Sequence, residues 1–89
     1  MAELKQIKVS CKSSVPQTAG SITISIESGC AVEVRAVGAG AVNQMYKAIA
    51  TARGTLASKG KDVLIRPGFT EVTENGESKT VMLAKLVVM

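Results

Sequence analysis

The sequence predicts an α/β domain of the two-layer α+β sandwich type, in which two helices cover one face of a four-stranded mixed sheet. Three observations predict this fold class. The 89 residues suffice for one small domain, 1–89, and 46% of them are hydrophobic, as in a globular chain. Strand-like and helix-like hydrophobic patterns follow one another in the order β-α-β-α-β-β. Right-handed crossovers then put both helices on the same side of the sheet.

The first strand is predicted at Ile7–Cys11, where polar and apolar residues alternate. A helix is expected next, because Ser14 is a suitable N-cap, Pro16 suits a first helical turn and Gly29 is a natural stop. Its apolar residues at helical spacing are Val15, Ala19, Ile22 and Ile26.

The segment 21–26 also fits a strand, since it alternates at period two and is rich in β-branched residues. A strand at this place would leave no crossover between the first strand and the next predicted one, Ala31–Val37. We therefore expect a helix.

The middle of the chain predicts a strand, a glycine turn and the clearest helix. Val32, Val34 and Ala36 share one face of the strand, and the turn is Gly38-Ala39-Gly40. The apolar stripe of the helix consists of Val42, Met45, Ile49, Ala52 and Leu56. Gly54 or Gly60 is expected to end the helical region.

The remainder predicts a β-hairpin. Its first strand starts at 62–66, is expected to break or bulge at Pro67-Gly68, and resumes at 69–73. Asn75-Gly76 marks a two-residue turn, and the last strand is placed at 79–88. Both faces of this last strand are largely apolar. Helices cover only one of them, so the other, with Val81, Leu83 and Val87, is a candidate oligomer face.

The predicted topology also brings two helix N-termini to one edge of the sheet, at the carboxyl ends of parallel strands. Unsatisfied N–H groups, small residues and two lysines would make this edge an anion-binding site. Alternatively, the glycines serve only a tight turn and the lysines are solvated. The candidate site residues are Lys12, Ser13, Ser14, Gly38, Gly40, Asn43 and Lys47.

Composition excludes several kinds of function. The chain has no His, so a Ser–His or Cys–His couple and a His-ligated metal cannot form, and we expect no enzyme, no metal and no cofactor. Cys11 and Cys30 are too few for a zinc cage, and we expect both to be buried apolar residues. No segment has the length of a membrane span or resembles a signal peptide, which predicts a cytoplasmic protein.

Charge favours an anionic partner. The formal net charge is +4, and the positive excess lies before Pro67, whereas the hairpin carries Glu74 and Glu77 at its tip. Tyr46 and Phe69 are expected in or beside the core, which leaves no aromatic for base stacking. The composition therefore permits sequence-nonspecific contact with the backbone of DNA or RNA.

The sequence closely resembles the stage V sporulation protein S family. The resemblance is carried by residues 7–14 and 36–44, continues through 47–50 to 52–54, and covers nearly the whole chain. This family is similar in fold to the Alba proteins, small dimeric βαβαββ nucleic-acid binders. The resemblance implies a regulator tied to sporulation, spore-coat assembly and septation. It also implies nucleic-acid contacts at the loop after the first strand and at the glycine turn.

Two departures from the Alba pattern stand out: the hairpin tip is acidic instead of basic, and Met45-Tyr46 is bulkier than expected. We expect a homodimer or higher homo-oligomer that binds nucleic acid, with no membrane and no small-molecule substrate. A protein-interaction or scaffold module without nucleic-acid binding is the main alternative. A sensor of phosphate or a nucleotide at the glycine edge is a third.

Overall fold

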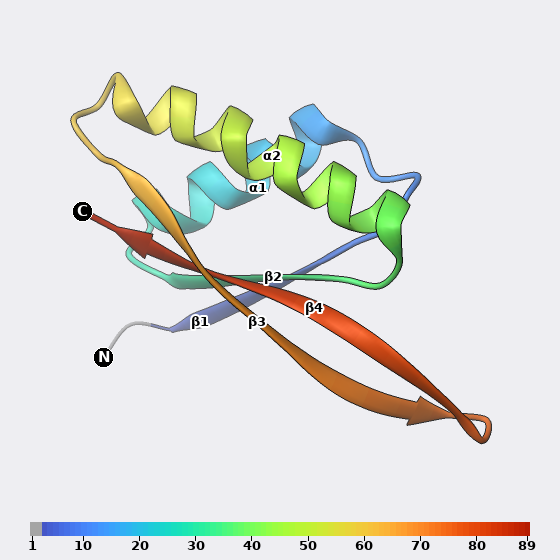
Figure 1. The fold of residues 1–89 in the computed structure, drawn as a ribbon. Coiled ribbons are helices and arrows are strands. Elements are labelled where there is room, and N and C mark those ends of the chain that lie inside the picture. Colours follow the sequence, from blue (N-terminus) through green and yellow to red (C-terminus); the bar gives the residue numbers. More distant parts are fainter. Residues whose placement is uncertain (1–2) are drawn as a thin grey trace.

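Two helices lie side by side on one face of a four-stranded sheet (Figure 1). The structure is a computed structural model that describes residues 3–89. Its elements are β1 (Leu4–Val9), α1 (Val15–Glu27), β2 (Ala31–Ala36), α2 (Ala39–Ala57), β3 (Val63–Glu74) and β4 (Glu77–Val88). The βαβαββ order and the two-layer arrangement predicted from the sequence are therefore confirmed.

The strand order in the sheet is β1-β2-β4-β3. β1 and β2 are parallel, and β4 runs antiparallel to both β2 and β3. The ladder between β2 and β4 is short, from Glu33 opposite Lys85 to Ala36 opposite Met82. β3 and β4 pair along all 12 residues of each strand, so the hairpin extends beyond β2 as a two-stranded arm (Figure 1).

The segment over which two interpretations competed is a helix. Ser14 caps α1, and its side-chain oxygen accepts a hydrogen bond from the Gln17 backbone N–H at 3.3 Å. Ile22 and Ile26 are buried, whereas Ile24 is 68% exposed. Because a helix has a period of 3.6 residues, it places Ile22 and Ile26 on one face and Ile24 on another. In a strand, all three side chains would share one face.

The core lies between the helices and the sheet. α1 contributes Ile22 and α2 contributes Leu56, both without exposed surface, and they belong to the same core cluster as the fully buried Val34 of β2. Val34 lies opposite Ala84, so Ala84 and Leu86 are on the helix side of β4. The other core residues are Val9, Ala19, Ile26, Val32, Ala36, Ala41, Met45, Ala48, Ile49, Ala52, Val63 and Ala84.

Several boundaries differ from the prediction. β1 begins at Leu4 and ends at Val9, so Ser10 and Cys11 belong to the following loop. α2 passes through Gly54 and ends at Ala57. Of the two predicted stops, Gly60 is therefore the correct one: its φ is 78°, and its N–H donates to the Ala57 carbonyl oxygen at 3.1 Å. Pro67 and Gly68 cause no bulge, since the β3–β4 register is continuous. β3 is an edge strand, where a residue without an N–H need not break a ladder.

Two predictions about burial are wrong. Tyr46 is 67% exposed and Phe69 is 69% exposed, because Tyr46 lies beside the apolar stripe of α2 and Phe69 lies on the edge strand. Cys11 is exposed and Cys30 is half-buried; both are free thiols. Cys11 is exposed because it lies in the loop that follows β1 instead of within the strand.

Candidate nucleic-acid interface at the helix N-termini

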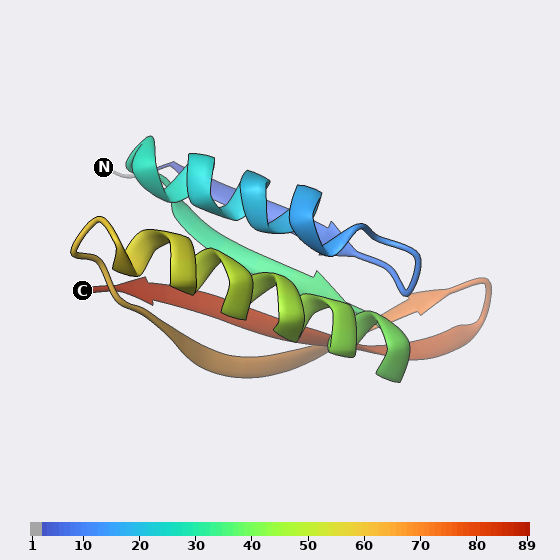
Figure 2. The same ribbon diagram turned by 90° about the horizontal axis from the view of Figure 1, so that it is seen from above.

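α1 and α2 begin at the same end of the sheet, as the parallel crossovers predict (Figure 2). The amide nitrogen of the Gln44 side chain donates a 3.0 Å hydrogen bond to the Ser13 carbonyl oxygen. This bond ties the β1–α1 loop to the N-terminal part of α2. The hairpin tip lies at this end of the molecule as well (Figure 2).

The β1–α1 loop uses its serines to hold its own shape. The Ser13 hydroxyl accepts a hydrogen bond from the Ser10 N–H at 2.8 Å, and the Lys12 N–H donates to the Ser10 hydroxyl at 3.2 Å. Ser14 caps α1, as described above. The loop thus presents Lys12, whose side chain is exposed, as its charged contact group.

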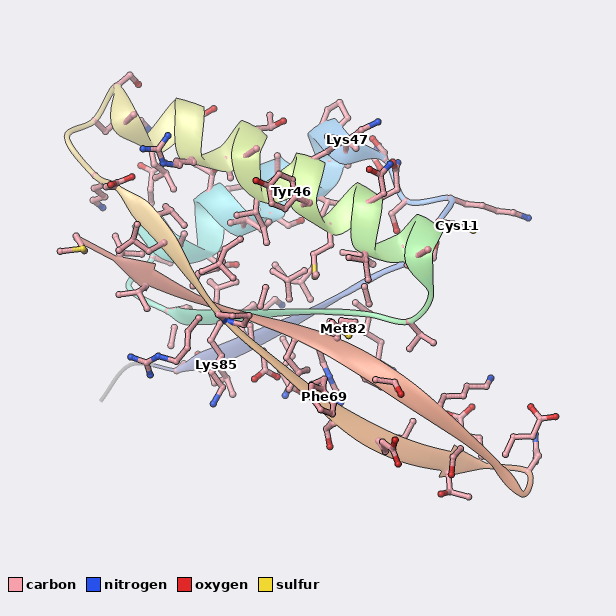
Figure 3. All side chains as sticks on the ribbon, viewed as in Figure 1. Cys11, Tyr46, Lys47, Phe69, Met82 and Lys85 are labelled. Carbon is pink, nitrogen blue, oxygen red and sulfur yellow. The ribbon has the colours of Figure 1, made fainter. Side chains whose placement is uncertain are left out.

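The start of α2 is open to an anion. Gly38 is its N-cap, at a φ of 91° and without a side-chain capping hydrogen bond, and neither helix has an acidic residue in its first turn. The first N–H groups of a helix have no partner within the helix and carry partial positive charge. Asn43 and Lys47 are exposed and lie four residues apart, on one face of α2. Figure 3 shows Lys47 on the outer side of α2.

Gly40 also has a role in the packing of this end of the fold. A Cβ at Gly40 would lie 3.0 Å from the Cys11 Cβ, which is closer than such atoms normally approach. Gly40 therefore allows the β1–α1 loop to pack against α2. The other predicted site residues lie on the loop or on the first turns of α2, so all seven meet at one end of the fold.

Sequence reasoning missed the apolar side of this end. Met82 of β4 and Phe69 of β3 are opposite one another in the ladder, on the helix side of the sheet, and both are exposed. Figure 3 shows Tyr46 on the side of α2 above these strands. The alternation of β4 predicts that Met82 lies on the helix side, but it does not predict that Met82 and Phe69 stay exposed there.

The family model for stage V sporulation protein S (SpoVS) matches residues 5–89. The chain belongs to this family. The match covers both helices and nearly all of the sheet, including every candidate residue of the interface. SpoVS is a sporulation-related family and is not a known enzyme family. Within residues 3–89, no helix is long and apolar enough to cross a membrane.

In this SpoVS-family chain, positive charge lies at the helix N-termini and negative charge lies at the tip of the arm. Lys12 and Lys47 flank the helix N-termini, while Glu74 and Glu77 are exposed at the tip of the arm. The Lys79 ammonium lies 4.0 Å from a Glu74 carboxylate oxygen and offsets part of the acidic charge. A polyanion would thus be attracted to the helix N-termini and repelled by the tip.

Proposed function

We propose that this SpoVS-family chain is a non-enzymatic regulator in sporulation that binds the backbone of DNA or RNA, without sequence specificity, through the two helix N-termini. The observation that carries the proposal is the juxtaposition of two acid-free helix N-termini, joined by the Gln44–Ser13 hydrogen bond and flanked by Lys12 and Lys47. Partial positive charge at helix N-termini and lysine ammonium groups both favour phosphate.

Salt-titrated binding tests this site. Lys12→Glu combined with Lys47→Glu is expected to weaken binding of duplex DNA or RNA and to reduce the slope of log K against log salt by about 2, one unit for each lost phosphate contact. The matched control is Arg66→Glu with Lys85→Glu, an exposed cross-strand pair on the other side of the sheet. It changes net charge by the same amount. Equal losses in both double variants would show that only net charge matters and would contradict the site.

We place self-association within the same proposal. The predicted oligomer face is only partly available, because Val81 is 6% exposed and Leu83 and Val87 are half-buried. Tyr46 and Phe69, on the helix side, expose much more apolar surface. A two-stranded arm is also marginally stable by itself, so covering this surface with a second copy of the chain would stabilise it.

Light scattering separates the two faces. Tyr46→Lys with Phe69→Lys is expected to lower the oligomer mass, whereas Leu83→Lys is expected to leave it unchanged. If only Leu83→Lys dissociated the oligomer, the open sheet face would be the contact. A monomeric wild-type chain would remove self-association from the proposal.

A scaffold role in spore-coat assembly or septation is the second candidate, and the acidic tip favours it. Glu74 and Glu77 are exposed at the tip of the arm, at the same end of the molecule as the helix N-termini, and they repel a polyanion. This alternative predicts no nucleic-acid binding even at low salt. A mononucleotide that binds as tightly as an oligonucleotide would instead support a nucleotide sensor.

A further inference from the structure

A hollow of about 540 Å³ lies where the carboxyl ends of β1 and β2 meet the arm. This volume is within the size range of small-molecule sites. One part of its wall is apolar and made of small side chains: Val9, Val37, Val72 and Val81. It also borders Gly38 and Gly40, so it adjoins the proposed nucleic-acid interface.

The charged part of the wall is mostly positive. Lys8 and Arg35 are direct neighbours in the parallel register of β1 and β2, and Lys79 adds a third cation from β4. Glu74 is the one acidic residue of the lining, and it is next to Lys79. Like charges directly opposite on neighbouring strands repel one another. A bound anion between Lys8 and Arg35 would remove this repulsion.

An independent observation at Arg35 points to the same ligand chemistry. The Arg35 Nε is buried and has no hydrogen-bond partner among residues 3–89. Native structures leave few buried donors unpaired, because such a group has lost its water without replacement. A carboxylate or phosphate oxygen is the acceptor that a guanidinium group binds best.

We propose that this hollow binds a small organic anion, with a carboxylate or phosphate head group against Arg35 and Lys8 and a compact apolar body against the valines. This proposal goes beyond nucleic-acid binding, and it replaces the expectation that the protein takes no small molecule. The site is separate from Lys12 and Lys47, neither of which lines the hollow.

Cys11 supplies a reporter, because it is exposed and lines the hollow. In a Cys30→Ser background, the rate of Cys11 alkylation by neutral iodoacetamide is measured with four probes. Benzoate and phenyl phosphate carry the two head groups on one apolar body, benzamidine has a similar shape with a positive charge, and inorganic phosphate lacks the body. Benzoate or phenyl phosphate is expected to slow alkylation and to shift the backbone amide resonances of Arg35 and Val81, while benzamidine does neither.

Substitutions then locate the head group. Arg35→Gln is expected to weaken binding of the anionic probe by about tenfold or more, the ordinary effect of losing a charge-assisted hydrogen bond. Arg66→Gln, an exposed arginine outside the hollow, is the matched control and should bind as the wild type does. Lys8→Gln, which changes an exposed side chain, gives a second variant whose affinity should fall.

The outcomes decide the proposal. Equal effects of benzoate and benzamidine, or wild-type affinity in both Arg35→Gln and Lys8→Gln, would overturn it. Equal binding of inorganic phosphate and phenyl phosphate would refute the apolar part of the site. The Lys12→Glu/Lys47→Glu variant should retain probe binding, so failure of this proposal and failure of the nucleic-acid proposal are distinguishable.

Discussion

Replacing Ile22 and Ile24 separately by Ala tests the helical nature of α1. Ile22 has no exposed surface, and Ile24 is 68% exposed on the same helix. Ile→Ala removes three carbons, so at about 0.8 kcal/mol for each buried CH₂ the lost transfer energy is about 2.4 kcal/mol. The cavity left behind raises the loss for Ile22→Ala to about 3–4 kcal/mol, within the usual range for such substitutions.

For a domain of this size, that loss corresponds to a fall in Tm of about 12–30 °C. Ile24→Ala is expected to change the free energy of unfolding by less than about 0.5 kcal/mol, because the side chain is mostly in water and Ala has the higher helix propensity.

Urea unfolding at one fixed protein concentration, followed by far-UV circular dichroism because the chain has no Trp, gives both values. In a strand, Ile22 and Ile24 would share a face, and the two substitutions would cost about the same. Comparable losses would therefore refute the helical packing described here.

Three further substitutions test local features of the fold. Ser14→Ala removes the α1 cap and should cost about 1 kcal/mol in urea unfolding. Gly76→Ala should cost about 1–2 kcal/mol because the turn holds this residue at a φ of 79°, whereas Gly20→Ala, in open space within α1, should stabilise by up to about 1 kcal/mol; equal effects would contradict the turn geometry. The hydrogen bond from Lys59 lowers the pKa of Glu27, so its contribution to stability is present above the ordinary carboxyl pKa and is lost as the pH falls through the lowered value. Glu27→Gln should make acid unfolding less steep, and a carbon-13 titration of Glu27 at an ordinary carboxyl pKa would disprove the interaction.

Signals carried by a few neighbouring residues predicted the elements well. Ser14 before Pro16 located the start of α1, and Asn75-Gly76 located the hairpin turn, where both residues have positive φ. These predictions succeed because a cap or a tight turn is decided by the backbone of adjacent residues. The helix at 21–26 needed topology as well, since its local pattern fits both structures.

Burial on the arm could not be predicted in the same way. Phe69 is exposed because β3 is the edge strand of the sheet, and nothing in the local sequence states which strand lies at the edge. Pro67 is accommodated because β3 is at the edge of the sheet. The strand order that creates this edge is a property of the whole fold.

The candidate interface was predictable as a location but not in its details. Parallel strands with crossovers bring the starts of α1 and α2 together, whatever their side chains. The contact between Gly40 and Cys11 and the unpaired Nε of Arg35 depend on packing between distant segments. The hollow depends on the path of the arm, and only the three-dimensional structure shows it.

The position of β4 has a consequence for synthesis of the protein. β4 follows every other element in the chain, yet it lies inside the sheet between β2 and β3. A nascent chain that ends at Asp62 already contains β1, α1, β2 and α2, but β2 still has one open edge. Chains grow at about 5–20 residues per second, so residues 82–85 are synthesised a second or more after Asp62. Until then, this edge of β2 lacks its partner and is open to wrong ones. The sheet closes only once residues 82–85 can pair with β2.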